Sequence, residues 1–299
     1  MRPVYLDTGT VAQAPLWDKP RLAAQAGYGG LELWHHDVDP SSLSAAARAI
    51  LRERYGVSAA GTAPTDLDRF ALVCRQLGLT IDGVIPPTDF AFRWHDDLGA
   101  DMRALIAGEL PKYQALGARY VVLPLLGEGG SIERTGEILA ELGELMRPFG
   151  IVAALEPMGH VKKGSRMAEA ARLLGHAGDD ANVGVIVDVF HFFQAGNVLA
   201  DLRAMAARRL VTVHLNDALD LPLHELSGAR HRVYPGEGIF DVVGFCGALA
   251  AIGYDGPCAV EVLNETYRGE DPGLVARRAF DATLAVLGAA VARPAHSNH

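Results

Sequence analysis

The sequence is poor in the features that mark secreted and membrane proteins. It has only 3 cysteines in 299 residues. Cys74, Cys246 and Cys258 lie in helix- or strand-like segments without metal-site spacing, so we expect reduced core thiols. No apolar run is long enough to span a membrane, and the first residues lack the basic and apolar segments that direct export. We therefore expect a cytoplasmic protein that does not enter a membrane.

Basic residues are also scarce. The chain has 27 Lys and Arg against 36 Asp and Glu, a formal net charge of −9. This balance argues against a nucleic-acid partner, because a nucleic-acid groove needs a basic surface. No glycine-rich turn opens a helix beside a basic residue, so the sequence has no recognisable phosphate cradle and favours an unphosphorylated ligand. Linkers, internal repeats and low-complexity tracts are missing as well.

Hydrophobic residues, at 49% of the chain, are plentiful enough for one large core, and the length fits one barrel better than two domains. Strand-like runs alternate with helical patterns at 3–7, 30–34, 80–85, 119–125, 151–156, 183–188, 210–215 and 258–262. This alternation predicts an α/β fold, a single (β/α)8 TIM barrel over residues 1–292 with a disordered tail at 293–299. Residues 56–61 form a ninth strand candidate. Their side chains are too small for a good strand core, so we predict that 40–78 is a long connection carrying two helices.

Four strand-like runs in the second half of the chain end on a residue that can bind a divalent metal. These residues are Glu156, Asp188, His214 and Glu261, at intervals of 32, 26 and 47 residues. Such intervals suit a repeating unit of roughly 30 residues, and barrels of this kind keep their chemistry at the carboxyl ends of the strands. One acidic residue at a strand end is more often a turn former or a helix cap. Three carboxylates and an imidazole converging on one point, however, would repel each other without a cation, so together they predict one divalent ion, with Mn²⁺, Mg²⁺, Co²⁺ and Zn²⁺ as candidates.

The chemistry of such a site can be argued from the residue types. Removing a proton from carbon next to a carbonyl is slow because negative charge builds on oxygen, and a cation bridging the carbonyl and a neighbouring hydroxyl stabilises that charge. A base must then meet the C–H bond, and an acid must return the proton. Glu156 and Glu261, on the fifth and eighth strands, can approach a bound sugar from different sides, so we predict that they are catalytic as well as metal-binding.

Short motifs occur in a consistent order along the chain. They are LeuGluLeuTrp at 31–34, LeuGluPro at 155–157, AspValPheHis at 188–191, HisLeuAsnAsp at 214–217, ArgValTyrProGlyGluGly at 232–238 and a GlyTyrAspGlyPro…ValGluVal segment at 253–262. Their order and spacing resemble the xylose-isomerase-like sugar phosphate isomerase/epimerase superfamily, from the first strand to about residue 290. The resemblance implies a TIM barrel with one metal site, and it says much less about the substrate.

The family's residues can be carried over position by position. In its ketose 3-epimerases two glutamates, an aspartate and a histidine hold one Mn-like ion, which implies Mn²⁺ here on Glu156, Asp188, His214 and Glu261. The resemblance also implies that His191 binds substrate oxygens and that Arg232 contacts the substrate, although Arg232 is further from His214 than in the ketose epimerases. His160, just after the GluPro pair, is a further candidate for substrate contact.

The resemblance leaves several functions open. The first is a metal-dependent isomerase or epimerase of a keto-sugar or related polyol, acting by proton abstraction next to a carbonyl through a metal-stabilised enediolate. The second is a dehydratase of the keto-inositol or dehydroshikimate type, in which the enolate expels a β-hydroxyl group. A non-catalytic sugar-binding role is a weaker alternative. In each case the partner is a small-molecule carbohydrate, and the oligomeric state, which includes a homo-oligomer, stays open.

A DNA-repair nuclease is a further alternative, because apurinic-endonuclease relatives share the AspXxxXxxHis and HisXxxAsnAsp motifs. That family uses a three-metal cluster with histidines from the third and fourth strands and an aspartate two residues before a histidine. Here those strands end in ProPro and ProLeuLeu, and Ala229 stands two residues before His231. We therefore predict that the trinuclear site cannot form.

Four other polar residues have a structural interpretation as well as a functional one. Glu32 falls inside an apolar strand, where a buried carboxylate needs partners, so we expect a structural salt bridge. His35 and His36 follow the second strand. Two adjacent side chains on a strand point to opposite faces. For these histidines, a position lining the mouth of the barrel and an exposed or helix-capping position are therefore equally open. We expect Glu237 to stabilise the ProGlyGluGly turn.

Overall fold

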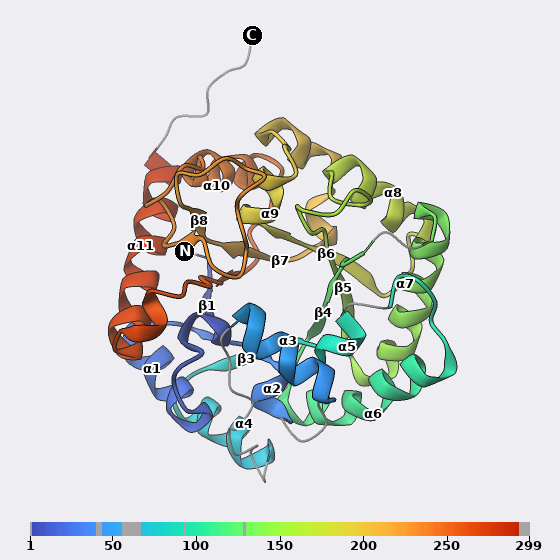
Figure 1. The fold of residues 1–299 in the computed structure, drawn as a ribbon, viewed down its shortest axis with the longest axis horizontal. Helices are drawn as coiled ribbons and strands as arrows, with labels where there is room; N and C mark the ends of the chain where they lie inside the picture. The colour runs from blue at the N-terminus through green and yellow to red at the C-terminus, as the bar shows by residue number, and fades with distance from the viewer. Residues whose placement is uncertain (1, 40–43, 56–66, 92–93, 128–129, 293–299) are drawn as a thin grey trace.

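A computed structural model describes residues 2–39, 44–55, 67–91, 94–127 and 130–292. Eight parallel strands close into a barrel in the order β1-β10-β7-β6-β5-β4-β3-β2, with the longer helices outside it (Figure 1). The strands are β1 Val4–Asp7, β2 Gly30–Trp34, β3 Thr80–Ile85, β4 Tyr120–Pro124, β5 Val152–Glu156, β6 Val183–Asp188, β7 Leu210–Leu215 and β10 Cys258–Val260. The predicted single (β/α)8 barrel and its eight strands are confirmed.

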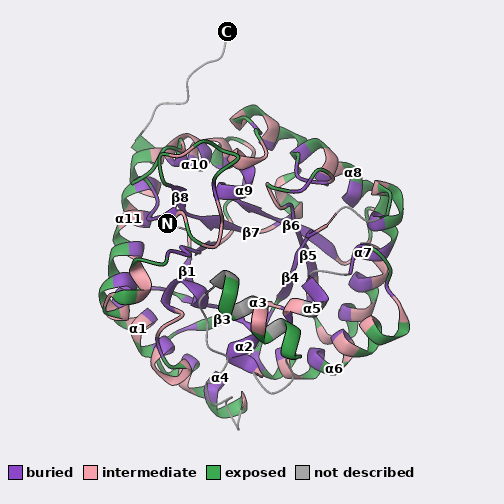
Figure 2. Cartoon of the chain, viewed as in Figure 1, coloured by how far each residue is buried: buried purple, intermediate pink, exposed green. Residues whose placement is uncertain are grey.

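These strands form where the sequence predicts them because both of their faces are covered. All residues of β4 and β6 are buried, and Figure 2 shows buried strands at the centre of a ring of helices that expose their outer faces. A strand between a filled barrel interior and a helical layer is selected for apolar side chains throughout, which gives continuous Val/Ile/Leu runs. The charged residue that ends such a run therefore lies where the barrel opens.

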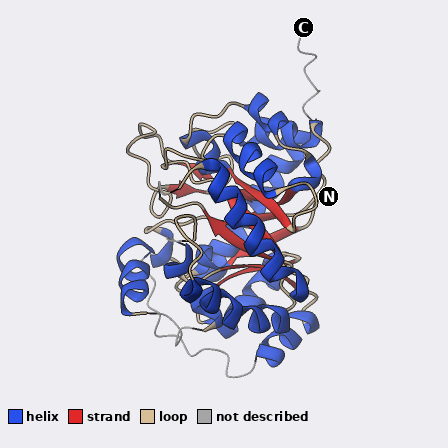
Figure 3. Cartoon of the chain, turned by 90° about the vertical axis from the view of Figure 1, so that its right-hand side faces the viewer, coloured by secondary structure: helices blue, strands red, loops and turns tan. Residues whose placement is uncertain are grey.

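Helices lie above, below and in front of the strands in a side view (Figure 3). The α-helices are α1 Lys19–Ala26, α2 His35–Val38, α3 Ala45–Tyr55, α4 Leu67–Gln76, α5 Thr88–Ala91, α6 Ala100–Leu116, α7 Ile132–Met146, α8 Met167–Ala177, α9 Val189–Gln194, α10 Val242–Ala251 and α11 Pro272–Ala292. Short 3-10 helices occur at η1 Thr8–Val11, η2 Leu16–Asp18, η3 Arg147–Phe149, η4 Leu199–Ala204, η5 Ala207–Arg209 and η6 Tyr267–Gly269. Among the described residues, no helix has the length and apolarity that crossing a membrane requires. Cys74, Cys246 and Cys258 are buried and unpaired, as predicted.

The long connection between β2 and β3 carries α3 and α4, so the prediction of two helices within 40–78 is confirmed. The ninth strand candidate at 56–61 and the tail at 293–299 lie outside the described residues.

The connection after β7 carries a small antiparallel pair. It consists of β8 Asp217–Ala218 and β9 Arg232–Val233, in register at Asp217↔Val233 and Ala218↔Arg232. The Asp217 carboxylate accepts hydrogen bonds from the backbone N–H groups of Gly236 (3.1 Å) and Gly238 (2.9 Å). This insertion explains the long interval before the last strand, and it brings Arg232 back over the carboxyl ends of the strands.

Candidate active site and metal centre

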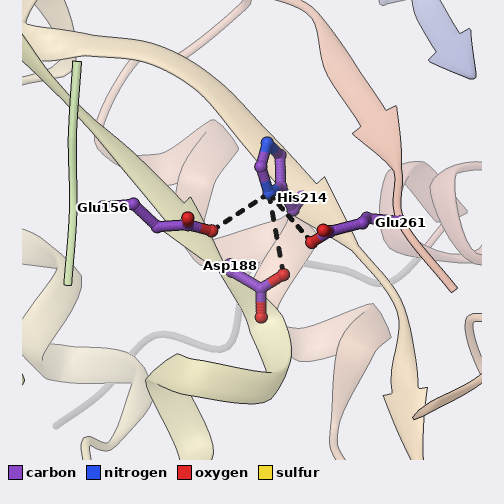
Figure 4. A group of neighbouring side chains, drawn as sticks. All are labelled: Glu156, Asp188, His214 and Glu261. Carbon is purple, nitrogen blue, oxygen red and sulfur yellow. Dashed lines mark ion pairs between the residues drawn. The ribbon is translucent and has the colours of Figure 1, made fainter. Parts of the chain in front are cut away.

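Four side chains converge at the carboxyl ends of neighbouring strands (Figure 4). Glu156, Asp188 and His214 lie in the last two residues of β5, β6 and β7, and Glu261 follows β10 directly. One donor atom from each lies within 4.8 Å of the others. The strand order explains this, because β5, β6, β7 and β10 are consecutive neighbours in the barrel. The predicted convergence of these four residues is thus seen in the structure.

His214 Nδ1 stands at the centre of the group. It lies 3.2 Å from Glu156 Oε1, 3.3 Å from Glu261 Oε2 and 3.8 Å from Asp188 Oδ2. Although both ring nitrogens of His214 are buried, neither makes a hydrogen bond of good geometry. A buried nitrogen without a hydrogen bond is costly unless something else occupies its lone pair. Three hard oxygen donors and one imidazole nitrogen fit a divalent cation such as Mn²⁺ or Zn²⁺.

The charge balance of the site fits a cation as well. No residue of the four is more than 5% exposed, so their charges are poorly screened by water. The guanidinium of Arg232 donates to Glu261 and lies 3.3 Å from Asp188 Oδ2. Burial opposes a charge on His214, but Glu32, Glu156 and Glu261 outweigh it and raise the pKa of His214 well above its ordinary value. The residues present therefore favour a further positive charge at this point.

The two glutamates are held in different electrostatic environments. Burial raises the pKa of Glu156 to about 7, helped by the charges of Glu261 and Asp188 and opposed by His214. Burial acts in the same direction on Glu261, but the guanidinium of Arg232 and the imidazole of His214 outweigh it and lower the pKa of Glu261 below its ordinary value. Without a cation, Glu156 is the carboxyl group that exchanges a proton near neutral pH.

The residues predicted to contact the substrate lie around this group. His191 is buried, and its Nε2 lies 3.3 Å from Arg232 Nη2. The ring of His160 lies beside that of His191, with 6.2 Å between the centroids. Burial lowers the pKa of His191 to about 4, and Arg232 and His160 act in the same direction. His191 is therefore a neutral imidazole at physiological pH, able to donate one hydrogen bond.

A cavity of about 370 Å³ opens over the site. Glu156 and Glu261 form part of its lining, and its other polar lining residues include His35, His36, His160, His191, Gln194 and Arg232. Apolar walls come from Trp34, Pro86, Pro87, Pro124, Leu126 and Leu263. A cavity with apolar walls and a few convergent polar groups is the usual form of a small-molecule site.

Comparison with known proteins agrees with this geometry. The model of the xylose isomerase-like TIM barrel matches residues 20–285. This chain belongs to the xylose isomerase-like TIM barrel family. The family resemblance seen in the sequence is thereby confirmed.

The relatives of this xylose isomerase-like barrel are enzymes. It is 31% identical over 160 residues to an inosose isomerase of Bacillus velezensis, a match that covers 52% of the chain and 57% of the isomerase. It is 27% identical over 257 residues to a 3-dehydroshikimate dehydratase of Pseudomonas aeruginosa, covering 84% of the chain and 36% of the dehydratase. The chain thus spans less than two thirds of the length of these relatives.

Solved structures confirm the fold. A crystal structure of the IOLI protein with a bound zinc atom superposes with a TM-score of 0.79 at 21% identity, covering 96% of this chain and 98% of that one. The structure of an L-ribulose 3-epimerase superposes with a TM-score of 0.71 at 18% identity, covering 100% of both chains.

Two buried residues of this family member support the four donors. The sequence predicts a structural salt bridge for Glu32. Its Oε1 lies 3.0 Å from Nε2 of His214. Asn216 was not singled out from the sequence. Its Nδ2 donates to Asp188 Oδ2 (2.8 Å), and its Oδ1 accepts from the backbone N–H of Phe190 (2.9 Å). The signal for Asn216 was its place two residues after His214, which in an extended chain gives both side chains the same face.

Both His35 and His36 are buried and line the cavity, so an exposed role is wrong for both. The reason is that α2 begins at His35, so the two side chains follow a helical turn instead of alternating across a strand. Glu237 is exposed, and the backbone hydrogen bonds of its turn go to Asp217.

The positions that would supply a three-metal nuclease centre hold other residues. Pro86, Pro87 and Leu126, at the ends of the third and fourth strands, line the cavity with apolar surface. His231 Nδ1 accepts a hydrogen bond from the backbone N–H of Ser227 (3.2 Å). Within the described ranges, Glu156, Asp188, His214 and Glu261 form the one group with metal-binding geometry.

Proposed function

We propose that this protein is a divalent-metal-dependent isomerase or epimerase of a keto-sugar or related polyol. The observation that carries the proposal is the set of four donors within 4.8 Å of one another, two of which, Glu156 and Glu261, also line the cavity. The inosose isomerase relatives make a keto-inositol the first substrate to test.

Glu156, Asp188, His214 and Glu261 would hold one ion, for which we propose Mn²⁺. When bound, the ion would supply positive charge that stabilises the negative charge developing on a substrate oxygen. The zinc atom in the IOLI protein supports a site for a divalent cation in this fold without fixing the metal here. Because the four donors stand at the ends of four neighbouring strands, the barrel itself would hold them in a fixed arrangement.

Glu156 and Glu261 are proposed as the proton carriers. They approach from opposite sides of His214 (Figure 4), so a substrate carbon between them would present one face to each carboxylate. One carboxylate would take the proton next to the carbonyl, and a carboxyl group on the same or the opposite face would return it. That choice decides between retention and inversion at carbon.

His191, Arg232 and His160 are proposed to position the substrate. The neutral His191 would donate a hydrogen bond to a substrate oxygen and share the charge that develops there. Arg232 is buried against Glu261 and Asp188, so it would orient the carboxylates as well as face the ligand. His160 lines the cavity next to His191.

The proposed ligand is a small, unphosphorylated carbohydrate. The cavity volume of about 370 Å³ suits a single sugar or cyclitol ring. Two cationic side chains, Arg230 and Arg232, are among its described lining residues, and both are already ion-paired, Arg230 with Glu265 at 3.0 Å. We further propose a cytoplasmic enzyme without a nucleic-acid or membrane partner. Light scattering would test whether it forms a homo-oligomer.

A dehydratase is the second candidate, favoured by the 3-dehydroshikimate dehydratase match over 84% of the chain. Both reactions begin with removal of a proton next to a carbonyl. In the isomerase the resulting enolate takes up a proton again, whereas in the dehydratase it expels a β-hydroxyl group.

Proton NMR in deuterium oxide distinguishes the candidates in one assay. Keto-inositols, ketoses and dehydroshikimate would each be incubated with the protein and Mn²⁺. We expect exchange of the proton next to the carbonyl together with new isomer signals. Loss of water instead would establish the dehydratase, and metal-loaded protein that catalyses no exchange on any of these substrates would overturn both.

A further inference from the structure

Glu32 is a carboxylate in the barrel interior that does not line the cavity. It lies in the middle of β2 and is 0% exposed. In the closed barrel, β2 is separated from β7 by β1 and β10, yet Glu32 Oε1 lies 3.0 Å from Nε2 of His214 on β7. The contact therefore crosses the barrel interior. It involves Nε2 of His214, whereas the other donors lie near Nδ1.

The second oxygen of Glu32 is held in place as well. The hydroxyl of Tyr120 on β4 donates to Glu32 Oε2 at 2.6 Å, and Tyr120 is itself fully buried. A carboxylate that is completely removed from water is costly unless it is paired and hydrogen-bonded. Glu32 Oε2 thus has a hydrogen-bond donor, and Oε1 lies at ion-pair distance from His214, a candidate metal ligand, without a hydrogen bond of good geometry.

The two nitrogens of His214 have different surroundings. Nδ1 faces the carboxylates of Glu156 and Glu261, while Nε2 faces Glu32. A neutral imidazole offers a lone pair on one nitrogen and a proton on the other, and the partner of the N–H determines which nitrogen is free for a metal. An acceptor behind Nε2 therefore directs the lone pair on Nδ1 toward the four-donor group.

We propose that Glu32 is a positioning residue that fixes the ring orientation of His214 for metal binding, with Tyr120 anchoring its carboxylate. This inference rests on the proposed metal site. It assigns Glu32 no contact with the substrate, because Glu32 acts only through His214.

The test is zinc affinity of the full-length protein, measured by competition with a chromophoric chelator. We expect Glu32→Gln to bind Zn²⁺ about 10- to 100-fold more weakly than the parent protein, the range found when such an outer partner of a metal-binding histidine is lost. Tyr120→Phe should weaken binding in the same direction by a smaller factor. Glu109→Gln is the matched control, because Glu109 is also buried and ion-paired, to Lys112 at 2.9 Å, without touching the four donors.

A spectroscopic measurement separates positioning from a general structural role. In the zinc-loaded parent protein the ring N–H proton of His214 should appear downfield in the NMR spectrum, as expected for a hydrogen bond to a carboxylate. It should move upfield in Glu32→Gln and stay in place in Glu109→Gln.

Each outcome decides a specific point. If the folded parent protein binds no Zn²⁺, the proposed metal site fails. If the parent binds and Glu32→Gln binds equally well, the inference is overturned while the metal site stands. Should Glu32→Gln not fold, Tyr120→Phe decides the question, and unchanged affinity and N–H signal in that variant would overturn the inference.

Discussion

Asp188 caps the helix that carries His191. Its Oδ1 accepts a hydrogen bond from the backbone N–H of His191 at 2.9 Å, and α9 begins at the residue after Asp188. On a continued strand, residues three apart would point to opposite faces, whereas a helical turn brings them to one side. The end of β6 therefore places a candidate metal ligand and a candidate substrate donor together at the mouth.

The first prediction concerns His191. Replacing it with Asn or Ala should leave metal binding and folding intact but lower kcat/KM by about 100- to 1,000-fold, the effect of losing one preorganised donor to a developing oxyanion. Steady-state kinetics on the substrate identified by NMR, with metal content measured on the same samples, checks this. A variant with a lower Tm but an unchanged rate per folded molecule would show that His191 only fills the core.

The second prediction concerns the metal ligands. Asp188→Ala and His214→Ala should each lose most of the bound metal, because the remaining donors keep their mutual repulsion but offer one ligand fewer. Metal analysis after adding Mn²⁺ and removing the excess gives the stoichiometry, which we expect to be one ion per chain in the parent protein. Parent-like metal content in both variants would show that the ion binds elsewhere or not at all.

The third prediction separates ligand from proton carrier at Glu156 and Glu261. Replacing either by Gln keeps an oxygen for the metal but removes the base. Turnover should therefore fall at least about 100-fold, as is usual for general acid–base groups. Metal affinity should fall less. Near-normal turnover in either variant, measured with the metal site saturated, would rule out a mechanism that uses both carboxylates.

The fold was predictable from the sequence because burial on both faces gives each barrel strand its own apolar run. The four donors were predictable because each stands at the end of such a run, and the first two intervals between them suit the repeating unit of the barrel. Arg232 was predicted from the family motif, and its ion pairs with Glu261 and Asp188 depend on a hairpin, β8–β9, whose two-residue strands leave no periodic pattern.

The supporting contacts were harder to predict. Glu32 reaches His214 across the barrel interior, and nothing in either strand's own sequence identifies the other as its partner. The burial of both His35 and His36 depended on the point where β2 gives way to α2, and a boundary shift of one residue changes which way a side chain faces. Contacts set by barrel closure and by element boundaries are those that local patterns predict least well.

The last prediction is a pH dependence of stability that comes from His36. Burial lowers the pKa of His36 to about 4, with Asp37 opposing and Lys19 reinforcing the shift, while a histidine in the unfolded chain titrates near about 6.5. Between these values the unfolded chain binds a proton that the folded protein excludes. The contribution of His36 is therefore fully present above about pH 6.5 and is lost as the pH falls toward 4, by roughly 3 kcal/mol at most.

Urea unfolding at a series of pH values should show a shallower decline in the free energy of unfolding for His36→Gln than for the parent protein. His224→Gln is the control, since that side chain is 83% exposed and its replacement should leave the slope unchanged. Parallel curves for the parent protein and His36→Gln would show that His36 is not held neutral by the fold.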